Sequence, residues 1–254
     1  MLNHPSVPPP QFWDNLSRPV LTRNALRELD RRNNIRDQND VRRALAKPRK
    51  SLSPSRFSEE EFEKFERADA HATTESRVVA TVTPLIEGDS GDPRAIASDV
   101  AFANLDHLTD GSLVCAKPDL YYGTRPEQLK KEVREAFSNF IIPSTQDDLP
   151  MAPNNFLEVK GPDGSLSVAT RQATYDGALG SRALNALQSF GAEQIHDNKA
   201  YTLAWTYHGG TLKAYTSHTI PPSTPQMPSM LTRFVKVLRI ATPKFASDYG
   251  HVRD

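Results

Sequence analysis

A short apolar pattern between residues 154 and 164 leads directly into a turn. Its strand-favouring positions are Phe156, Leu157 and Val159. Residues 161–164, Gly-Pro-Asp-Gly, are rich in turn-forming residues. Glu158 and Lys160 interrupt the apolar pattern two residues apart, so on a strand they share one face and Val159 lies on the other. The pattern predicts a strand over 154–160 that presents an acid and a base side by side near its end.

Apolar residues at helical spacing predict helices elsewhere in the chain. The predicted helices cover residues 58–87, with a break near 73–74, and residues 125–140, 169–190 and 230–240. Ser58 with Glu61, and Thr124 with Glu127, form the S/T-x-x-E pattern of a capping box. Gly191 follows the third helix as a C-terminal cap would.

Further strands are predicted from alternating polarity and from turn residues. Residues 102–108 and 113–116 are expected to form a hairpin around Asp110-Gly111. Residues 200–207 and 211–218 are expected to form a second hairpin, with His208 and His218 on the surface at its ends. Helices mixed with strands in this order predict an α/β sandwich around a mixed sheet.

The composition separates the first quarter of the chain from the rest. Residues 1–56 hold a Pro8-Pro9-Pro10 run and more basic than acidic residues after Arg18, which predicts a disordered, basic, proline-rich N-terminal tail. Its end, residues 47–56, is interpreted as either a nuclear-import or nucleic-acid tether or a solvated linker. Residues 57–254 are expected to form a single α/β domain.

The location is expected to be intracellular, with the nucleus as one reading. The N-terminus has neither the charged region nor the apolar region of a secretory signal, and no apolar run is long enough to span a membrane. The single cysteine, Cys115, follows Leu113-Val114 and is expected to be a buried structural thiol.

The pair Glu158 and Lys160 suggests metal chemistry. Two charged side chains at the end of an apolar strand are costly to bury without a task. In one such task the carboxylate holds a divalent metal and the lysine orients a water beside it. A second carboxylate is available from Asp119, in Pro118-Asp119. Carboxylate oxygens select hard cations, so the expected metal is Mg²⁺ or Mn²⁺.

Pro118-Asp119 followed by Glu158-Val159-Lys160 resembles the signature of the PD-(D/E)XK nuclease superfamily. The longer text, KPDLYYGTRPEQL followed by NNFLEVKGPDGSLSVATRQATYDGALGSRAL, is similar to a domain family of filamentous fungi. The superfamily resemblance implies a core in which a helix precedes three strands, followed by a helix and further strands. In the simplest form of that core a short turn joins the two signature strands, whereas here a helix and a loop intervene.

The resemblance also implies roles for residues outside the signature. It implies a third metal-binding carboxylate from the helix before the sheet, for which Glu75 is the first candidate and Glu87 the second; the alternative is an exposed helical glutamate. It implies a polar residue near the metal from the helix after the signature, which Gln172 fits; the alternative is a surface glutamine. Lys130, Lys131, Arg171 and Arg182 are candidate phosphate contacts or solvated side chains.

Two functions from different classes remain open at this stage. The first is a metal-dependent nuclease that hydrolyses DNA or RNA with Asp119, Glu158, Lys160 and Gln172. The second is a catalytically inactive nuclease-like fold that binds a protein or a nucleic acid. The acid–base trio favours the first, whereas the balance of 31 basic and 31 acidic residues favours the second. A hydrolase for another substrate is a third reading, and the oligomeric state is left open.

Overall fold

The computed structural model describes residues 58–88, 92–146, 148–193, 196, 199–220 and 231–241, the last of these as backbone alone. The expected tail, residues 1–56, lies outside the described residues. No helix within the described segments is both long and apolar enough to cross a bilayer.

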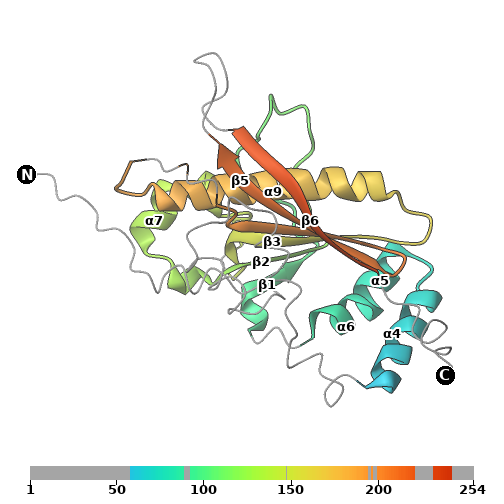
Figure 1. Cartoon of the computed structure of the whole chain (residues 1–254). Coiled ribbons are helices and arrows are strands. Elements are labelled where there is room, and N and C mark those ends of the chain that lie inside the picture. The colour runs from blue at the N-terminus through green and yellow to red at the C-terminus, as the bar shows by residue number, and fades with distance from the viewer. Residues whose placement is uncertain are drawn as a thin grey trace, which may run out of the picture.

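The strands form one sheet in which each strand pairs with the strand next to it in the sequence (Figure 1). They are β1 (Ile96–Ser98), β2 (Leu120–Thr124), β3 (Met151–Lys160), β4 (Thr202–His208), β5 (Thr211–Ile220) and β6 (Leu231–Ala241). Neighbours run antiparallel except β3 and β4, which run parallel because helix α9 (Leu166–Gln188) carries the chain back between them. This mixed sheet between helices confirms the predicted α/β sandwich.

The N-terminal helices cover one face of the sheet. They are α4 (Glu59–His71), α5 (Glu75–Thr81) and α6 (Thr83–Glu87), and the predicted break near residues 73–74 is confirmed. The predicted capping box is also present, because the Ser58 hydroxyl accepts from the Glu61 amide while the Glu61 carboxylate accepts from the Ser58 amide. Buried Phe65 packs with Leu157 and the other apolar residues of this sheet face.

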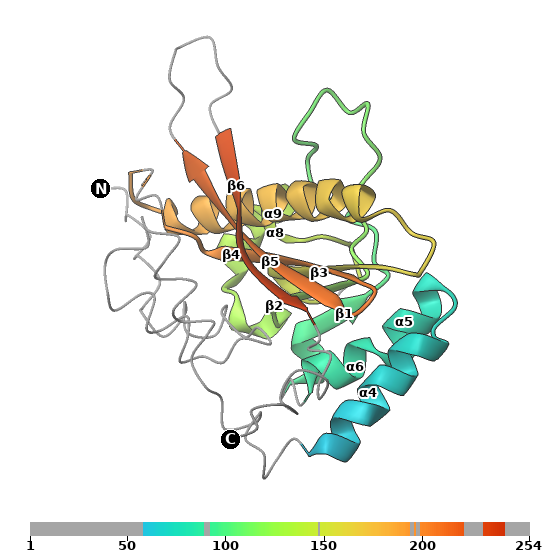
Figure 2. The same ribbon diagram turned by 45° about the vertical axis from the view of Figure 1, so that its right-hand side comes forward.

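Helix α9 covers the opposite face, as Figure 2 shows. The core on this side contains Phe102, Tyr121, Phe156, Ala173 and Ala204. Gly180 allows the helix to lie close to the sheet, since a Cβ atom there would stand 2.8 Å from the Phe156 ring and 2.9 Å from the Pro153 carbonyl oxygen.

The segment between β2 and β3 differs from the prediction of one helix over 125–140. It forms a 3₁₀ turn, η3 (Pro126–Gln128), and two short helices, α7 (Lys131–Ala136) and α8 (Ser138–Ile141). The predicted capping box is wrong because Thr124 belongs to β2 and does not cap a helix. Its hydroxyl donates instead to the Gln128 side chain at 3.0 Å. The segment packs against α9 in its own apolar cluster, so β2 remains the neighbour of β3.

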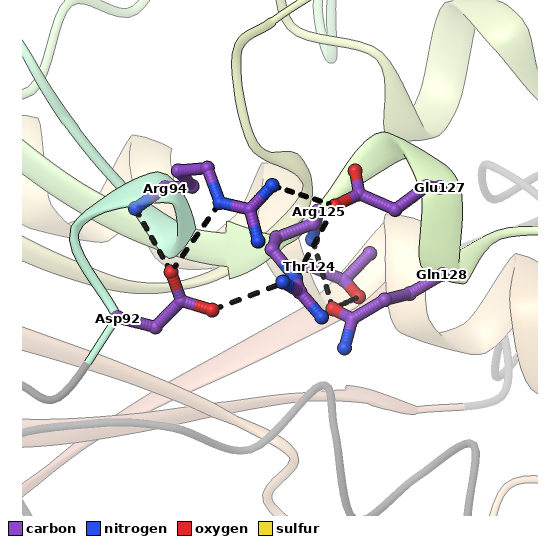
Figure 3. A network of polar contacts seen from close by, with 6 residues as sticks. All are labelled: Asp92, Arg94, Thr124, Arg125, Glu127 and Gln128. Atoms are coloured by element: carbon purple, nitrogen blue, oxygen red, sulfur yellow. Dashed lines mark hydrogen bonds and ion pairs between the residues drawn. The ribbon is translucent and has the colours of Figure 1, made fainter.

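A network of charged side chains joins η3 to the 3₁₀ turn η2 (Pro93–Ala95) at the C-terminal end of β2 (Figure 3). The Asp92 carboxylate lies between two guanidinium groups, 3.9 Å from Arg94 Nε and 3.5 Å from Arg125 Nε. Arg94 also donates to Glu127 at 3.2 Å. Arg94 and Glu127 are more than half exposed, so these pairs hold loops in place but stabilise the fold only weakly.

The predicted hairpin over 102–116 is wrong. Residues 101–119 form an extended loop whose backbone bonds to other segments, with the Asn104 amide donating to Pro143 O and the Asp106 amide to Asn139 O. The loop exposes Leu113 and Val114, which are 48 % and 88 % exposed, and Cys115 is only partly buried. The apolar run around Cys115 therefore does not indicate a core strand.

The predicted helix over 230–240 is also wrong. Residues 231–241 are the edge strand β6, which pairs antiparallel with β5 from Thr211↔Ala241 to Ile220↔Leu231. The segment is rich in β-branched and aromatic residues, and pairing with β5 gives its backbone hydrogen-bond partners on one side, with a register shift at Ala214/Tyr215. The helical spacing of its apolar residues did not decide its structure, because pairing with β5 favours a strand.

Candidate active site

The register of β2 and β3 brings Asp119 and Glu158 to the same end of the sheet. Leu120 pairs with Leu157 and Tyr121 with Phe156, so Asp119, one residue before β2, continues the antiparallel register opposite Glu158. Asp119 Oδ2 accepts a hydrogen bond from the Val159 amide at 2.7 Å. The intervening segment therefore does not separate the two carboxyl groups.

Glu158 and Lys160 share the α9 face of β3, as their spacing predicted. They are 1 % and 7 % exposed, whereas Val159 is buried in the cluster on the opposite face. The Lys160 ammonium nitrogen lies 3.9 Å from Glu158 Oε2 and 3.0 Å from Glu75 Oε2. The lysine therefore joins the strand carboxylate to the helix before the sheet.

Glu75 reaches the site from the first turn of α5, with its side chain 45 % exposed. The approach depends on the turn after β3. A Cβ atom at Gly161 would stand 2.8 Å from the Glu75 amide nitrogen, and one at Gly164 would stand 2.7 Å from Lys160 Cβ. The two glycines of this turn thus allow the start of α5 and the Lys160 side chain to pack against the turn.

Asp176 is a member of the site that the sequence analysis did not assign. It lies on α9, is 1 % exposed, and its carboxyl group lies close enough to that of Glu158 to raise the pKa of Glu158. A signal for it exists in the sequence. The apolar stripe of α9 runs through Ala169, Ala173, Gly180, Leu184 and Leu187. Asp176 occupies a position on that stripe, where an acidic side chain is out of place.

Burial governs the protonation of these carboxyl groups. Desolvation, followed by the mutual repulsion of Glu158 and Asp176, raises the pKa of Glu158 well above its usual range, and desolvation also raises the pKa of Asp176. Desolvation raises the pKa of Asp119 as well, although the Val159 amide opposes this. Because the negative charge of Asp176 opposes ionisation of Glu158, this pair binds a proton more tightly than two isolated carboxyl groups would.

Buried polar atoms without a hydrogen-bond partner gather around Glu158. Among the described residues these atoms include both Glu158 carboxylate oxygens, Asp176 Oδ2, Gln172 Oε1, Thr206 Oγ1 and His208 Nε2. Thr206 and His208 are the β4 register partners of Glu158 and Lys160, and Gln172 stands one helical turn before Asp176. The expectation of a surface position is therefore wrong for His208, which is half-buried beside Lys160.

The other predicted candidates lie elsewhere. Glu87 accepts a hydrogen bond from the Tyr122 hydroxyl, on the sheet face opposite Glu158, and burial raises its pKa to about 7. Arg182 donates to the Asp106 and His107 carbonyl oxygens, and its guanidinium group lies over the Phe140 ring. It therefore holds the loop before β2 in place and is not a free phosphate contact.

The donor chemistry of the site fits a hard divalent cation, although it does not form a complete cage. In the part of the chain that the structure describes, no three His, Cys, Asp or Glu side chains converge as ligands of one metal ion. Mg²⁺ commonly takes only one or two protein carboxylates and completes its shell with water and substrate phosphate. The unpartnered oxygens of Glu158, opposite Asp119, match that smaller requirement.

Comparison with known proteins adds no relative. No family model, curated protein or solved structure matched the chain.

Proposed function

We propose that this chain is a metal-dependent nuclease that hydrolyses phosphodiester bonds of DNA or RNA, with Asp119, Glu158 and Lys160 at the reacting centre. The observation that carries the proposal is Glu158, which is buried, finds no hydrogen-bond donor among the described residues and touches a second buried carboxyl group. A buried carboxylate whose oxygens lack hydrogen-bond donors is destabilising. A bound cation would supply the missing partner.

The order of the elements supports the same proposal. Helix α5, strands β1 to β3, helix α9 and strand β4 follow the order that the PD-(D/E)XK resemblance implies. The aspartate stands at the start of the second strand and the E-x-K sequence at the end of the third, on adjacent strands.

In this proposal Asp119 and Glu158 hold Mg²⁺ or Mn²⁺, and Glu75 is the candidate for a further carboxylate. The bound cation would stabilise charge on the phosphoryl oxygens and lower the pKa of a water molecule. Lys160 lies between two carboxylates, at 3.0 Å from Glu75 and 3.9 Å from Glu158, and directs an ammonium group to the same place. It orients the attacking water or offsets the charge that develops on the phosphate. Gln172 would contribute its amide from α9.

Calorimetric titration with Mn²⁺ tests the metal site directly. We expect saturable binding by the wild type, loss of that binding in Glu158→Gln, and unchanged binding in Glu132→Gln, which removes an exposed carboxylate on α7. Cleavage of plasmid DNA and of RNA with Mg²⁺ is then measured for the wild type and for Lys160→Met. If folded wild-type protein binds no Mn²⁺, or if Glu158→Gln binds it equally well, the proposed site is wrong.

A binding module without catalysis is the second candidate, and specific contacts favour it. Asp119 Oδ2 already accepts the Val159 amide, and Lys160 already pairs with Glu75. A proton shared by Glu158 and Asp176 would satisfy the buried pair without a metal. Binding of a labelled oligonucleotide in EDTA, measured by fluorescence anisotropy, together with no Mn²⁺ binding and no cleavage, would favour this reading over the nuclease.

A further inference from the structure

A second polar recess lies between the C-terminal half of α9, the segment leading into β4 and the end of β5. It is an open hollow of about 240 Å³ including its solvent-filled mouth. Its lining includes Ser181, Asn185, Lys199, Ser217 and His218. None of these residues belongs to the site around Glu158, so the recess needs an explanation of its own.

Two buried serine hydroxyls belong to the lining of this recess. Ser181 and Ser217 are 4 % and 0 % exposed, and within the described residues neither hydroxyl oxygen has a hydrogen-bond partner. The same holds for Thr202, the register partner of Ser217 on β4. Buried hydroxyls are normally paired, so the Ser181 and Ser217 hydroxyls in the lining mark a place where a bound group could complete the hydrogen bonding.

The lining is selective in its chemistry. All eight lining side chains can donate a hydrogen bond, and none of them is a carboxylate. Lys199 adds a positive charge and His218 a second group able to carry one. A lining that can donate hydrogen bonds and that includes no carboxylate favours an oxyanion over a cation or an apolar ligand.

The recess is held in shape by the contact between α9 and the sheet. Gly180, next to Ser181, allows an approach in which an added Cβ atom would stand 2.9 Å from Thr202 Cγ2. The hydroxyl groups of α9 and of β4 and β5 are therefore fixed relative to one another before any ligand arrives. Such preorganisation lowers the entropic cost of binding.

We propose that this recess binds a phosphoryl oxyanion, with Ser181 and Ser217 donating to it and Lys199 balancing its charge. The source of the group is either a free phosphate or phosphomonoester, or the backbone of a nucleic-acid strand. Asn185 lies nine residues beyond Asp176 on the same helix, an axial rise of about 13 Å at 1.5 Å per residue and about two and a half turns, so the two residues face different sides of α9. The nucleic-acid source rests on the proposed nuclease function, since the recess would then hold a second phosphate of the same strand.

Thermal unfolding in inorganic phosphate, against chloride at equal ionic strength, tests the recess without any metal. We expect phosphate to raise the unfolding midpoint of the wild type saturably, and Ser217→Ala and Lys199→Met to weaken that binding at least tenfold. Lys131→Met, which removes an exposed lysine on α7, is the matched control and should behave as wild type. Ser217→Ala removes a hydroxyl without a partner, so its fold should survive and its loss of response reports on binding.

Two further ligands in EDTA separate the sources. If adenosine monophosphate binds and its binding depends on Ser217 and Lys199, the recess is a phosphomonoester site. If only the binding of a short single-stranded oligonucleotide depends on these residues, the recess holds the backbone of a nucleic-acid strand. If no ligand shows dependence on these residues, ordered water alone satisfies the hydroxyls and the proposal is overturned. Glu158→Gln should keep the phosphate response, so failure of the metal site is distinguishable from failure of the recess.

Discussion

On the face of the sheet covered by α4 to α6, two buried tyrosine hydroxyls each donate to a carboxylate of the helical layer. Tyr122 donates to Glu87 and Tyr207 to Asp69. On the α9 face, both carboxylate oxygens of Glu158 and the hydroxyls of Thr206 and other residues find no partner among the described residues. Both faces have an apolar centre. The chain itself therefore completes the first face, whereas the proposed ligands would complete the buried polar groups of the second.

The largest expected effect is on the self-contained face. Leu157 is 6 % exposed in its core cluster, so Leu157→Ala should lower the free energy of unfolding by about 3 kcal/mol through lost burial and a cavity. Urea denaturation measures the loss. Mn²⁺ affinity, measured under folding conditions, should remain at the wild-type value. A loss of affinity as large as that in Glu158→Gln would show that the two faces are not independent.

A smaller loss of stability is expected where α9 meets the sheet. Gly180→Ala places a Cβ atom 2.8 Å from the Phe156 ring and 2.9 Å from the Pro153 carbonyl oxygen, so it should destabilise the fold by about 2 kcal/mol through overpacking. Denaturation by urea measures this effect, and Gly209→Ala, at a position with open space around it, is the comparison. Because Gly209 has φ +50°, Gly209→Ala measures the cost of backbone strain alone, without a steric clash. An unchanged stability in Gly180→Ala would mean that α9 can shift.

The protein should become more stable when the charge of Glu158, on the α9 face, is removed. Glu158→Gln replaces a repelled carboxylate by an amide that can donate to Asp176, so the free energy of unfolding should rise by about 1–2 kcal/mol near neutral pH. The pKa of Glu158 is higher in the folded protein than in the unfolded chain. The stability of the wild type therefore falls as pH rises above the pKa that Glu158 has in the unfolded chain. The gain should therefore grow with pH and vanish in acid. A loss of stability at neutral pH would contradict the repulsion.

An effect that depends on pH is expected at Glu87, behind Tyr122. Its pKa is raised from 4.5 to about 7 by burial, so the folded protein holds a proton there that the unfolded chain releases. Its contribution to stability is present below pH 4.5 and is lost as pH rises to about 7. Glu87→Gln should remove that part of the pH dependence in denaturation series, whereas Glu60→Gln on α4 should keep it. Identical profiles for the wild type and Glu87→Gln would contradict the assignment.

Local signals in the sequence predicted the elements that carry the signature residues. The turn at 161–164 and the alternation before it predicted the end of β3 and the common face of Glu158 and Lys160. The capping box at Ser58 predicted the start of α4. Each signal lies within a few residues of the feature it specifies, so it did not require knowledge of tertiary contacts.

The wrong predictions and the missed site residues concern features that depend on contacts with segments distant in the sequence. The loop around Leu113 is anchored by contacts with residues 138–143, and β6 is a strand because β5 offers it an edge. Thr206 and His208 join the site only because β4 pairs parallel with β3. Asp176 was the recoverable miss, because an acid on the apolar stripe of α9 is visible in the sequence.

The pairing of β3 with β4 has a consequence for how the protein is made. Every other adjacent pair of strands is antiparallel, and all pairs are neighbours in the sequence, so the sheet can grow strand by strand as the chain leaves the ribosome. Parallel pairing must wait until α9 has emerged and folded back, which is a slower closure. Glu158, the carboxylate of β3, therefore stays accessible to water during synthesis until α9 and β4 have followed it.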